Sequence, residues 1–168
     1  MTTKTTHTTS FTIMPSPVGP LTLIGDGDDL VGVYFDTGSS VAAPRDGWVR
    51  DDRRLRPAAA QLTEYFAGKR TRFDLPLAPR GTAFQAAVWA ALLRIPFGET
   101  ASYGDIARAI GKPAASRAVG GANHRNPLSI VIPCHRVIGA DGGMTGYGGE
   151  LYRKRLLLDL ELRVAAAR

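Results

Sequence analysis

The N-terminal third of the chain alternates apolar and polar positions in short runs, which is the pattern of β-strands. The turn-forming sequences SPVGP and GDGDD separate these runs. The runs that predict strands lie at residues 11–14, 21–24 and 30–35. Because tight turns join them, the pattern predicts an antiparallel meander.

The residues that follow complete a small α/β unit. Residues 36–56 are polar and rich in Gly, Pro and Arg, which indicates a loop or crossover. Residues 57–67 begin with a proline and precede a glycine, so they predict a short helix. Residues 72–77 predict one more strand, and residues 74–81 (DLPLAPRG) are the expected linker. The predicted N-terminal domain, residues 11–80, is therefore a small antiparallel sheet with a helix.

After residue 81 the apolar spacing becomes helical. Apolar side chains recur at the spacing of one helix face: Phe84, Val88, Ala91, Leu92 and Ile95. Thr82 is the expected N-cap, and Pro96 and Gly98 end the helix. This pattern predicts a helix with one face against a core.

Two shorter helices follow, at residues 103–110 and 116–122, with Ser102 as N-cap and Gly111 as C-cap of the first. Two short helices joined by a tight turn predict a helix-turn-helix. The second is nearly bare of large side chains apart from Arg117, whereas a helix that reads bases in the major groove carries long polar side chains. Small residues suit close approach to a nucleic-acid backbone or minor groove. Tight helix packing is the alternative explanation.

The end of the chain contains an apolar segment, a Gly-rich loop and a helix. Residues 126–133 (NPLSIVIP) are interpreted as an extended segment that leads to Cys134. The Gly-rich loop spans residues 139–149, and the helix spans residues 151–163. Three leucines of this helix are expected to pack inward: Leu156, Leu157 and Leu160. Residues 81–168 therefore predict a mainly α domain that carries the helix-turn-helix.

Composition limits the class of protein. A chain of 168 residues suits one domain or two small ones, and 44% hydrophobic with 21% charged residues excludes global disorder. The Thr-rich residues 1–10 predict a disordered tail. No secretory signal is present, and no apolar run approaches the roughly 20 residues that span a bilayer, so no membrane partner and a cytoplasmic location are expected.

The formal net charge of +6 is unevenly distributed. Residues 1–80 carry ten Lys and Arg against nine Asp and Glu, whereas residues 81–168 carry eleven against six. A basic C-terminal half indicates a polyanionic partner such as nucleic acid. A solvated arginine-rich surface is the alternative, because 17 of the 21 cations are Arg.

A single cysteine excludes an internal disulfide, and with only His7, His124 and His135 beside it the sequence argues against a closed tetrahedral zinc site, so no metal is expected. Cys134 is either a small buried apolar residue or a working thiol. A working thiol needs a base or a positive neighbour, because at its reference pKa of about 8.5 little of it is thiolate at neutrality. His135 reaches Cys134 only if the chain turns there or a water bridges them, since neighbours in an extended chain point to opposite faces. Glu161, Asp159 and Glu150 are each candidates for a carboxylate that holds the imidazole.

Four short motifs in the C-terminal half occur together: PCHRV at residues 133–137, SRAVGGAN at 116–123, NP at 126–127 and GYGG at 146–149. SYGDIA precedes them and a KxxLLxxE-like helix follows. In order and spacing they resemble the O6-alkylguanine-DNA alkyltransferases, and SPVGPLTL near the start is similar to the N-terminal domain of that family. The resemblance covers nearly the entire chain.

The resemblance implies direct-reversal DNA repair without a cofactor or metal. An alkyl group on O6 of guanine, or less readily on O4 of thymine, would pass to Cys134 once per molecule, after the base flips out of duplex DNA. The partner would be double-stranded alkylated DNA, and the chain would act as a monomer, with cooperative binding on DNA left open.

The resemblance also implies roles for residues around the acceptor. His135 would activate Cys134 through a water, and Glu161 would orient that histidine. Asn126 would brace the turn. Tyr103 would rotate the phosphate of the target nucleotide and donate a proton toward guanine N3.

Other residues would contact DNA and the flipped base. Arg117 would enter the duplex and fill the gap, while Ser116, Ala118 and Gly120 would lie against the minor groove. Four residues would form the pocket: Pro133 and Tyr147 as walls, Gly148 through its amide toward O6, and Val137 through its carbonyl. The carbonyls of Val137 and Cys134 would accept from the guanine amino group.

The sequence departs from the family pattern at two places. Glu150 stands where the family often has Gly, which would narrow the range of adducts or repel phosphate. His124 and Arg125 precede Asn126 where a Gly is common, and they would add phosphate contacts. Some relatives carry a structural zinc, against which the lone cysteine argues.

Three other classes of protein are alternatives. A binding module of this fold would recognise alkylguanine without removing the alkyl group, but such relatives lack the acceptor cysteine. A transcription regulator would need base-reading side chains on the second helix. A cysteine hydrolase would turn over many times without DNA.

Overall fold

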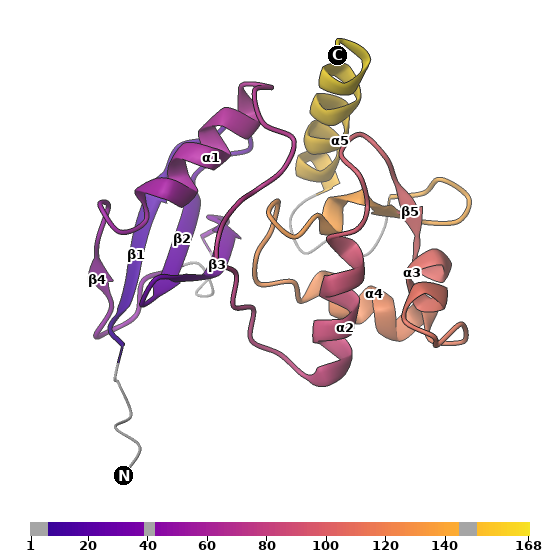
Figure 1. Cartoon of the computed structure of the whole chain (residues 1–168), viewed down its shortest axis with the longest axis horizontal. Helices are drawn as coiled ribbons and strands as arrows, with labels where there is room; N and C mark the ends of the chain where they lie inside the picture. Colours follow the sequence, from indigo (N-terminus) through magenta and orange to yellow (C-terminus); the bar gives the residue numbers. More distant parts are fainter. Residues whose placement is uncertain (1–6, 39–42, 145–150) are drawn as a thin grey trace.

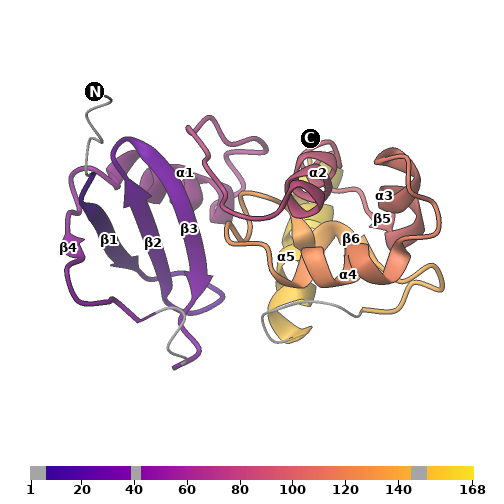
Figure 2. The same cartoon turned by 90° about the horizontal axis from the view of Figure 1, so that it is seen from below.

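The chain folds into a sheet lobe and a helical lobe that lie side by side (Figures 1 and 2). The structure is a computed structural model that describes residues 7–38, 43–144 and 151–168. The strands of the sheet lobe are β1 (Thr9–Met14), β2 (Leu21–Asp26), β3 (Asp29–Phe35) and β4 (Val49–Arg50). Their order is β3-β2-β1-β4.

The meander β1-β2-β3 is antiparallel as predicted, but β4 pairs parallel with β1, so the sheet is mixed. β1 also begins at Thr9, inside the predicted tail.

Helix α1 (Arg56–Phe66) covers one face of the sheet (Figure 1). Alternate strand residues point to this face, and partners such as Leu21 and Phe35 stand opposite each other in the register. A β-bulge at Gly25 lies under the start of the helix. A Cβ at Gly25 would lie 2.8 Å from Ser10 Oγ and 3.2 Å from Leu55 Cδ2, so glycine permits the close packing there.

The strand predicted at residues 72–77 is reduced to a single bridge between Leu77 and Leu30. Leu30 donates its amide to the carbonyl of Pro76 at 2.8 Å and accepts from Ala78 at 3.0 Å. Pro76 has no amide hydrogen to donate, which limits how far the segment can pair as a strand. The prediction of a full strand was wrong.

The helical lobe contains α2 (Ala83–Leu92), α3 (Tyr103–Ala109), α4 (Ser116–His124) and α5 (Leu151–Ala166). The short strands β5 (Ala101–Ser102) and β6 (Val137–Ile138) pair in parallel. Thr82 and Ser102 each form a capping box with the residue three positions later, as their sequences predict. Ile110, and not Gly111, is the C-cap of α3; Gly111 follows it with φ 74°. No helix within the described ranges has the length and apolar character needed to cross a membrane.

The apolar faces of α2 and α5 differ in how well the sequence predicts them. Of the expected stripe, Val88, Ala91 and Leu92 are buried on α2, Phe84 is partly buried, and Ile95 is buried just beyond the end of the helix. Trp89 adds a hydrogen bond from its indole nitrogen to the carbonyl of Ala122 in α4 at 2.9 Å. On α5 the buried residues are Arg153, Lys154, Leu157, Leu158 and Glu161. Leu156 is 46% exposed, so its predicted inward position was wrong. Three charged residues, Arg153, Lys154 and Glu161, lie on the buried face of α5, and this face does not include Leu156.

The sheet lobe is hydrogen-bonded directly to the segment that precedes Cys134. Val33 of β3 donates to the carbonyl of Pro127 at 2.8 Å and accepts from the amide of Ser129 at 3.2 Å. Arg153 of α5 donates from Nε to the carbonyl of Val18 at 3.0 Å. The edge of the sheet therefore supports the position of the cysteine segment.

Candidate active site and nucleic-acid interface

The segment before Cys134 contains a tight turn and is not extended as predicted. Ile132 donates its amide to the carbonyl of Leu128 at 2.8 Å, and Ile130 has φ 72°. A β-branched residue at positive φ is strained, and such strain persists only where surrounding contacts enforce it. Asn126 supplies two of these contacts, because its Nδ2 donates to the Ile132 carbonyl at 2.8 Å and its Oδ1 accepts from the Leu128 amide at 3.0 Å.

A 3₁₀ turn, Cys134–Arg136, follows directly. The amide of Arg136 donates to the carbonyl of Pro133 at 3.0 Å, which closes the turn. Cys134 and His135 are both buried in it. The alternation of side chains along a strand therefore does not separate the thiol from the imidazole.

His135 is held by Glu161 of α5. The two side chains are fully buried, and Nε2 lies 2.7 Å from Oε1. Burial raises the pKa of Glu161, but hydrogen bonds and positive charge from His135 and Arg136 outweigh it and lower the pKa to about 2. The carboxyl is therefore ionised and accepts, so the hydrogen on the His135 ring belongs to Nε2.

The other ring nitrogen of His135 is a free acceptor. Nδ1 has no hydrogen-bond partner among the described residues. Burial lowers the pKa of His135 below its ordinary 6.5, against the opposing effect of Glu161. The imidazole is neutral at neutral pH, with the Nδ1 lone pair available to take a proton. Of the other carboxylates considered, Asp159 is exposed and Glu150 lies outside the described residues.

The thiol of Cys134 is protonated in this environment. Burial raises its pKa to about 11, although a hydrogen bond with Asn126 and the charge of Lys154 partly offset the effect. The site is a neutral thiol beside a neutral imidazole and not a thiolate–imidazolium pair. A base must therefore remove the thiol proton as the sulfur attacks.

Arg136 is a buried member of the site to which the sequence assigned no role. Its Nε donates to Glu161 Oε2 at 2.8 Å, and one terminal nitrogen donates to Oε1 at 2.9 Å. The other terminal nitrogen donates to the carbonyl of Ile95 at 2.7 Å. An arginine within the apolar run VIPCHRVI was the available signal, because a buried charge requires a partner.

Two further residues contact the carbonyl of the first residue of the 3₁₀ turn and the carbonyl of the residue that follows the turn. Asn123 of α4 donates from Nδ2 to the Cys134 carbonyl at 3.3 Å. Lys154 of α5 donates from Nζ to the Val137 carbonyl at 2.5 Å. Neither contact could be predicted from the sequence, because each joins elements that are distant along the chain.

Tyr103 lies between α4 and the strand that follows the cysteine. It is the first residue of α3, directly after β5, and the pairing of Ser102 with Ile138 brings it beside β6. A Cβ at Gly120 of α4 would lie 3.8 Å from the Tyr103 ring. The structure thus brings Tyr103 together with α4 and with the residues after Cys134.

The outer face of α4 is basic and smooth. Its exposed residues are Arg117, Ala118, Gly121, His124 and Arg125, whereas Ser116 and Gly120 are half-buried. Helix packing explains the small size of Ala122, which is buried against α2. It does not explain Gly121, because a Cβ there would meet nothing within 4 Å. The absence of bulk on this face instead suits the close approach of a partner.

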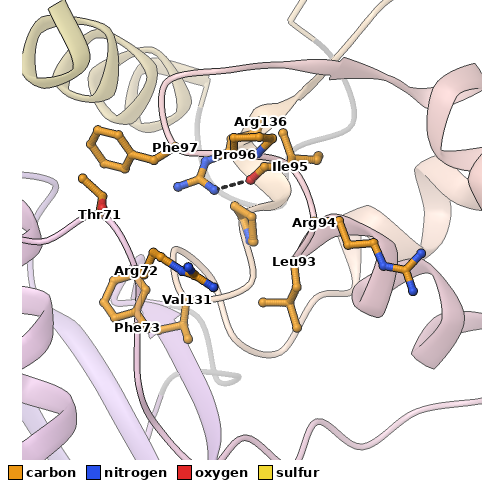
Figure 3. Close-up of a pocket in the computed structure, with 11 residues that line it drawn as sticks. Thr71, Arg72, Phe73, Leu93, Arg94, Ile95, Pro96, Phe97, Val131 and Arg136 are labelled. Atoms are coloured by element: carbon orange, nitrogen blue, oxygen red, sulfur yellow. Dashed lines mark hydrogen bonds between the residues drawn. The ribbon is translucent and has the colours of Figure 1, made fainter.

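A cavity of about 730 Å³ lies next to the 3₁₀ turn, between the residues after α1 and the loop after α2 (Figure 3). Arg136 lines it, and the bond from Arg136 to Ile95 is drawn dashed in Figure 3. Pro133 also lines this cavity, but Val137 does not. Tyr147 and Gly148 lie outside the described residues. The alkyl pocket formed by these four residues therefore stays a prediction.

The fold and the site define a helix-turn-helix protein with a buried cysteine next to a buried histidine–glutamate pair. Residues 83–163 match the DNA binding domain of 6-O-methylguanine DNA methyltransferase, and residues 10–79 match its ribonuclease-like domain. The chain belongs to this family, as its motifs predict.

Individual relatives agree with this assignment. The chain is 52% identical over 151 residues to the methylated-DNA--protein-cysteine methyltransferase of Methanosarcina acetivorans, covering 90% of this chain and 97% of that protein. The crystal structure of Mycobacterium tuberculosis O6-methylguanine methyltransferase is 50% identical and superposes with a TM-score of 0.88, covering 95% of this chain and 96% of that one. A structure of the Mycobacterium tuberculosis protein in complex with DNA gives a TM-score of 0.86, at 50% identity and with 92% and 94% of the two chains covered.

Proposed function

We propose that this chain repairs duplex DNA by transferring the alkyl group of O6-alkylguanine to Cys134, once per molecule. The observation that carries the proposal is the arrangement of the acceptor: a buried thiol next to a neutral histidine whose hydrogen-bearing nitrogen is fixed on Glu161. The family membership and the DNA complex of a relative support DNA as the partner.

The transfer begins with removal of the thiol proton. Nδ1 of His135 takes this proton, through one water, while Sγ attacks the alkyl carbon. The Sγ–C bond forms and the C–O6 bond breaks. The departing guanine receives a proton at N3 from the Tyr103 hydroxyl, and the imidazolium and tyrosinate that remain neutralise each other through solvent. The thioether product is stable, so the molecule does not turn over.

The exposed face of α4 serves to reach a base inside a duplex. Chemistry on O6 requires flipping, which costs a few kcal/mol and less for a poorly paired base. Arg117 would fill the gap, while Ser116, Ala118 and Gly120 allow the helix to approach the minor groove. His124 and Arg125 are exposed at the end of α4 and add phosphate contacts.

The flipped base is oriented by the carbonyls of Cys134 and Val137. The carbonyl of Val137 accepts from Lys154, and the carbonyl of Cys134 accepts both from Asn123 and from the amide of Val137. Since a carbonyl oxygen has two lone pairs, Val137 can also accept from the guanine amino group, whereas at Cys134 the amino group must share or replace one of the two present bonds. Asn123 and Lys154 hold the two carbonyls in place before the base enters.

The proposal extends to O4-alkylthymine as a poorer substrate. One acceptor and one Arg117 per chain suffice for one repair event, so the acting unit is a monomer. Its expected location is the cytoplasm.

Intact-mass spectrometry tests the proposed function. The protein is mixed with a duplex that contains one O6-methylguanine. The expected result is one methyl group per protein, located on Cys134, with no further uptake at excess DNA. Folded, reduced protein that gains no mass would overturn the transferase function.

Replacing Arg117 by alanine is expected to lower the single-turnover rate on alkylated duplex about tenfold or more, but the rate with a free O6-alkylguanine base by less than about twofold. The reason is that Arg117 replaces the flipped base in the stack, and a free base needs no flipping. Both rates are measured by mass spectrometry under single-turnover conditions.

Arg163→Ala is the matched control. It removes the same charge from the end of α5 that lies away from α4 (Figure 1). Its rates on both substrates should stay close to those of the unmodified protein. Equal losses on duplex and free base in Arg117→Ala would contradict the role of Arg117 in flipping.

A further inference from the structure

A tyrosine of the sheet lobe reaches the carboxylate that holds His135. Tyr65, on α1, is fully buried, and its hydroxyl donates to Glu161 Oε1 at 2.8 Å, although the two residues are 96 positions apart. We propose that Tyr65 is a positioning residue of the alkyl-transfer site, which acts on His135 through Glu161. This inference rests on the proposed function for its catalytic meaning.

Tyr65 and His135 share one oxygen of Glu161. Oε1 accepts from Tyr65, from His135 and from Arg136, while Oε2 accepts from Arg136 and from the amide of Gly98 at 3.3 Å. A carboxylate offers about four acceptor positions, so five donors saturate it. The tyrosine hydroxyl therefore withdraws part of the negative charge that would otherwise act on the His135 proton.

Aromatic rings hold the hydroxyl in place. Tyr65 packs edge-on against Phe66 at 5.3 Å and Phe97 at 6.1 Å, and tilted against Phe73 at 5.6 Å. The Arg136 guanidinium lies over Phe97 at 5.6 Å, so the same ring contacts two of the residues that donate to Glu161, Tyr65 and Arg136. Figure 3 shows Phe73, Phe97 and Arg136 around the neighbouring cavity. Tyr65 is thus oriented by α1, by the segment after it and by the loop after α2.

The hydroxyl remains a donor at every working pH. Burial, and then the negative charge of Glu161, raise the pKa of Tyr65 well above 10. The charged groups that face His135 are Glu161, which raises its pKa, and Arg136 and Lys154, which lower it. Tyr65 is a neutral donor to Glu161, and it comes from the sheet lobe.

The direction of the effect follows from this geometry. Without the Tyr65 hydroxyl, Oε1 is more basic and stabilises protonated His135 more strongly. The pKa of His135 rises, and the base is lost at a higher pH. The sheet lobe therefore keeps His135 neutral and ready to accept the thiol proton.

Tyr65→Phe tests the proposal. The single-turnover rate with a free O6-alkylguanine base is measured against pH, which avoids any effect on DNA binding. In the unmodified protein the rate falls as pH drops through the pKa of His135, below 6.5. In Tyr65→Phe this fall should occur at higher pH, with a rate at neutral pH about three- to tenfold lower.

Tyr34→Phe is the matched control, because alternation along β3 places Tyr34 on the sheet face away from α1. It should leave the profile unchanged.

A second substitution keeps the test independent of folding. Replacement of Tyr65 by 3-fluorotyrosine keeps the ring and the hydroxyl, and this hydroxyl donates a stronger hydrogen bond. The fall of the rate at acid pH (the acid limb of the profile) should therefore move to lower pH. The proposal would be overturned if the rate fell at the same pH in both Tyr65 variants as in the unmodified protein. A loss of rate in Tyr65→Phe with no shift of the limb would also overturn it, since that result indicates a packing role.

Nitrogen-15 NMR of His135 separates this proposal from the proposed function. The pKa of His135 should rise in Tyr65→Phe and fall with 3-fluorotyrosine, whether or not the protein transfers alkyl groups. A protein that gains no methyl group in the mass experiment but shows these shifts would overturn the function and retain the positioning role. An unchanged pKa of His135 in an active protein would overturn only the role of Tyr65.

Discussion

Replacing Cys134 by alanine is expected to abolish alkyl transfer while the protein still binds alkylated duplex within about threefold of the original affinity. Cys134 is the one thiol in the sequence and is buried, whereas the exposed basic side chains that we propose to contact DNA are on the outer face of α4. Removing a single buried sulfur should cost about 1 kcal/mol of stability, so the variant should fold. Intact-mass spectrometry measures transfer, and binding is measured with the O6-methylguanine duplex.

The binding measurement is the control for the mass measurement. A variant that binds but gains no mass assigns the acceptor role to the thiol alone. Loss of binding together with loss of folding would instead indicate that Cys134 is a structural residue. Continued uptake of a methyl group in Cys134→Ala would show that another side chain is the acceptor.

Replacing Glu161 by glutamine should lower both stability and activity by large factors. The amide keeps one acceptor oxygen but turns a donor toward either His135 or Arg136. Arg136 is then a buried charge without a counter-charge, which typically costs about 3–5 kcal/mol. The His135 tautomer is no longer fixed, and the transfer rate should fall about a hundredfold. Urea unfolding and single-turnover kinetics measure the two effects.

Glu64→Gln is the matched control for this change. Glu64 pairs with Arg70 at 2.7 Å, but both side chains are partly exposed, at 46% and 27%. Loss of such a pair should change the free energy of unfolding by less than about 1 kcal/mol. Equal losses in the free energy of unfolding from the two substitutions would mean that the buried hydrogen bonds around Glu161 contribute no more to stability than a partly exposed ion pair.

The pH dependence of stability should follow the same carboxylate. The pKa of Glu161 is lowered to about 2 in the folded protein, against an ordinary value of 4.5. Its contribution is therefore present above pH 4.5 and is lost as pH falls toward 2. The stability difference between the unmodified protein and Glu161→Gln should shrink over this window. His135 also has a lowered pKa in the folded protein, so its protonation weakens the fold as pH falls below 6.5.

Local patterns in the sequence determined the positions of the helices and the N-caps of α2 and α3. Thr82 and Ser102 accept from the amides of the first helical turn, which involves only residues three positions apart. The stripe on α2 and the smooth face of α4 also follow from helical periodicity. The short motifs around Cys134 are also local patterns. They identified the family because a contiguous stretch of residues carries most of the reacting groups.

Long-range packing decided the electrostatics of the site. The sequence offered three carboxylates to hold His135, and only the burial of α5 selects Glu161 over the exposed Asp159. The same burial turned Leu156 outward, because Lys154 and Glu161 take the inner face. A periodicity based on apolar residues places charged residues outside, so it could not predict this face.

The sequence by itself thus determined which residues are available for the chemistry: one cysteine, the histidine next to it and a bare basic helix. The tertiary structure decided their state. Burial keeps Cys134 protonated and His135 neutral, and Arg136 and Tyr65, which are distant along the chain, both donate to Glu161. The physical reason is that caps and helix faces depend on neighbours within a turn or two. The pKa of a buried group depends on every charge and dipole that the fold brings around it.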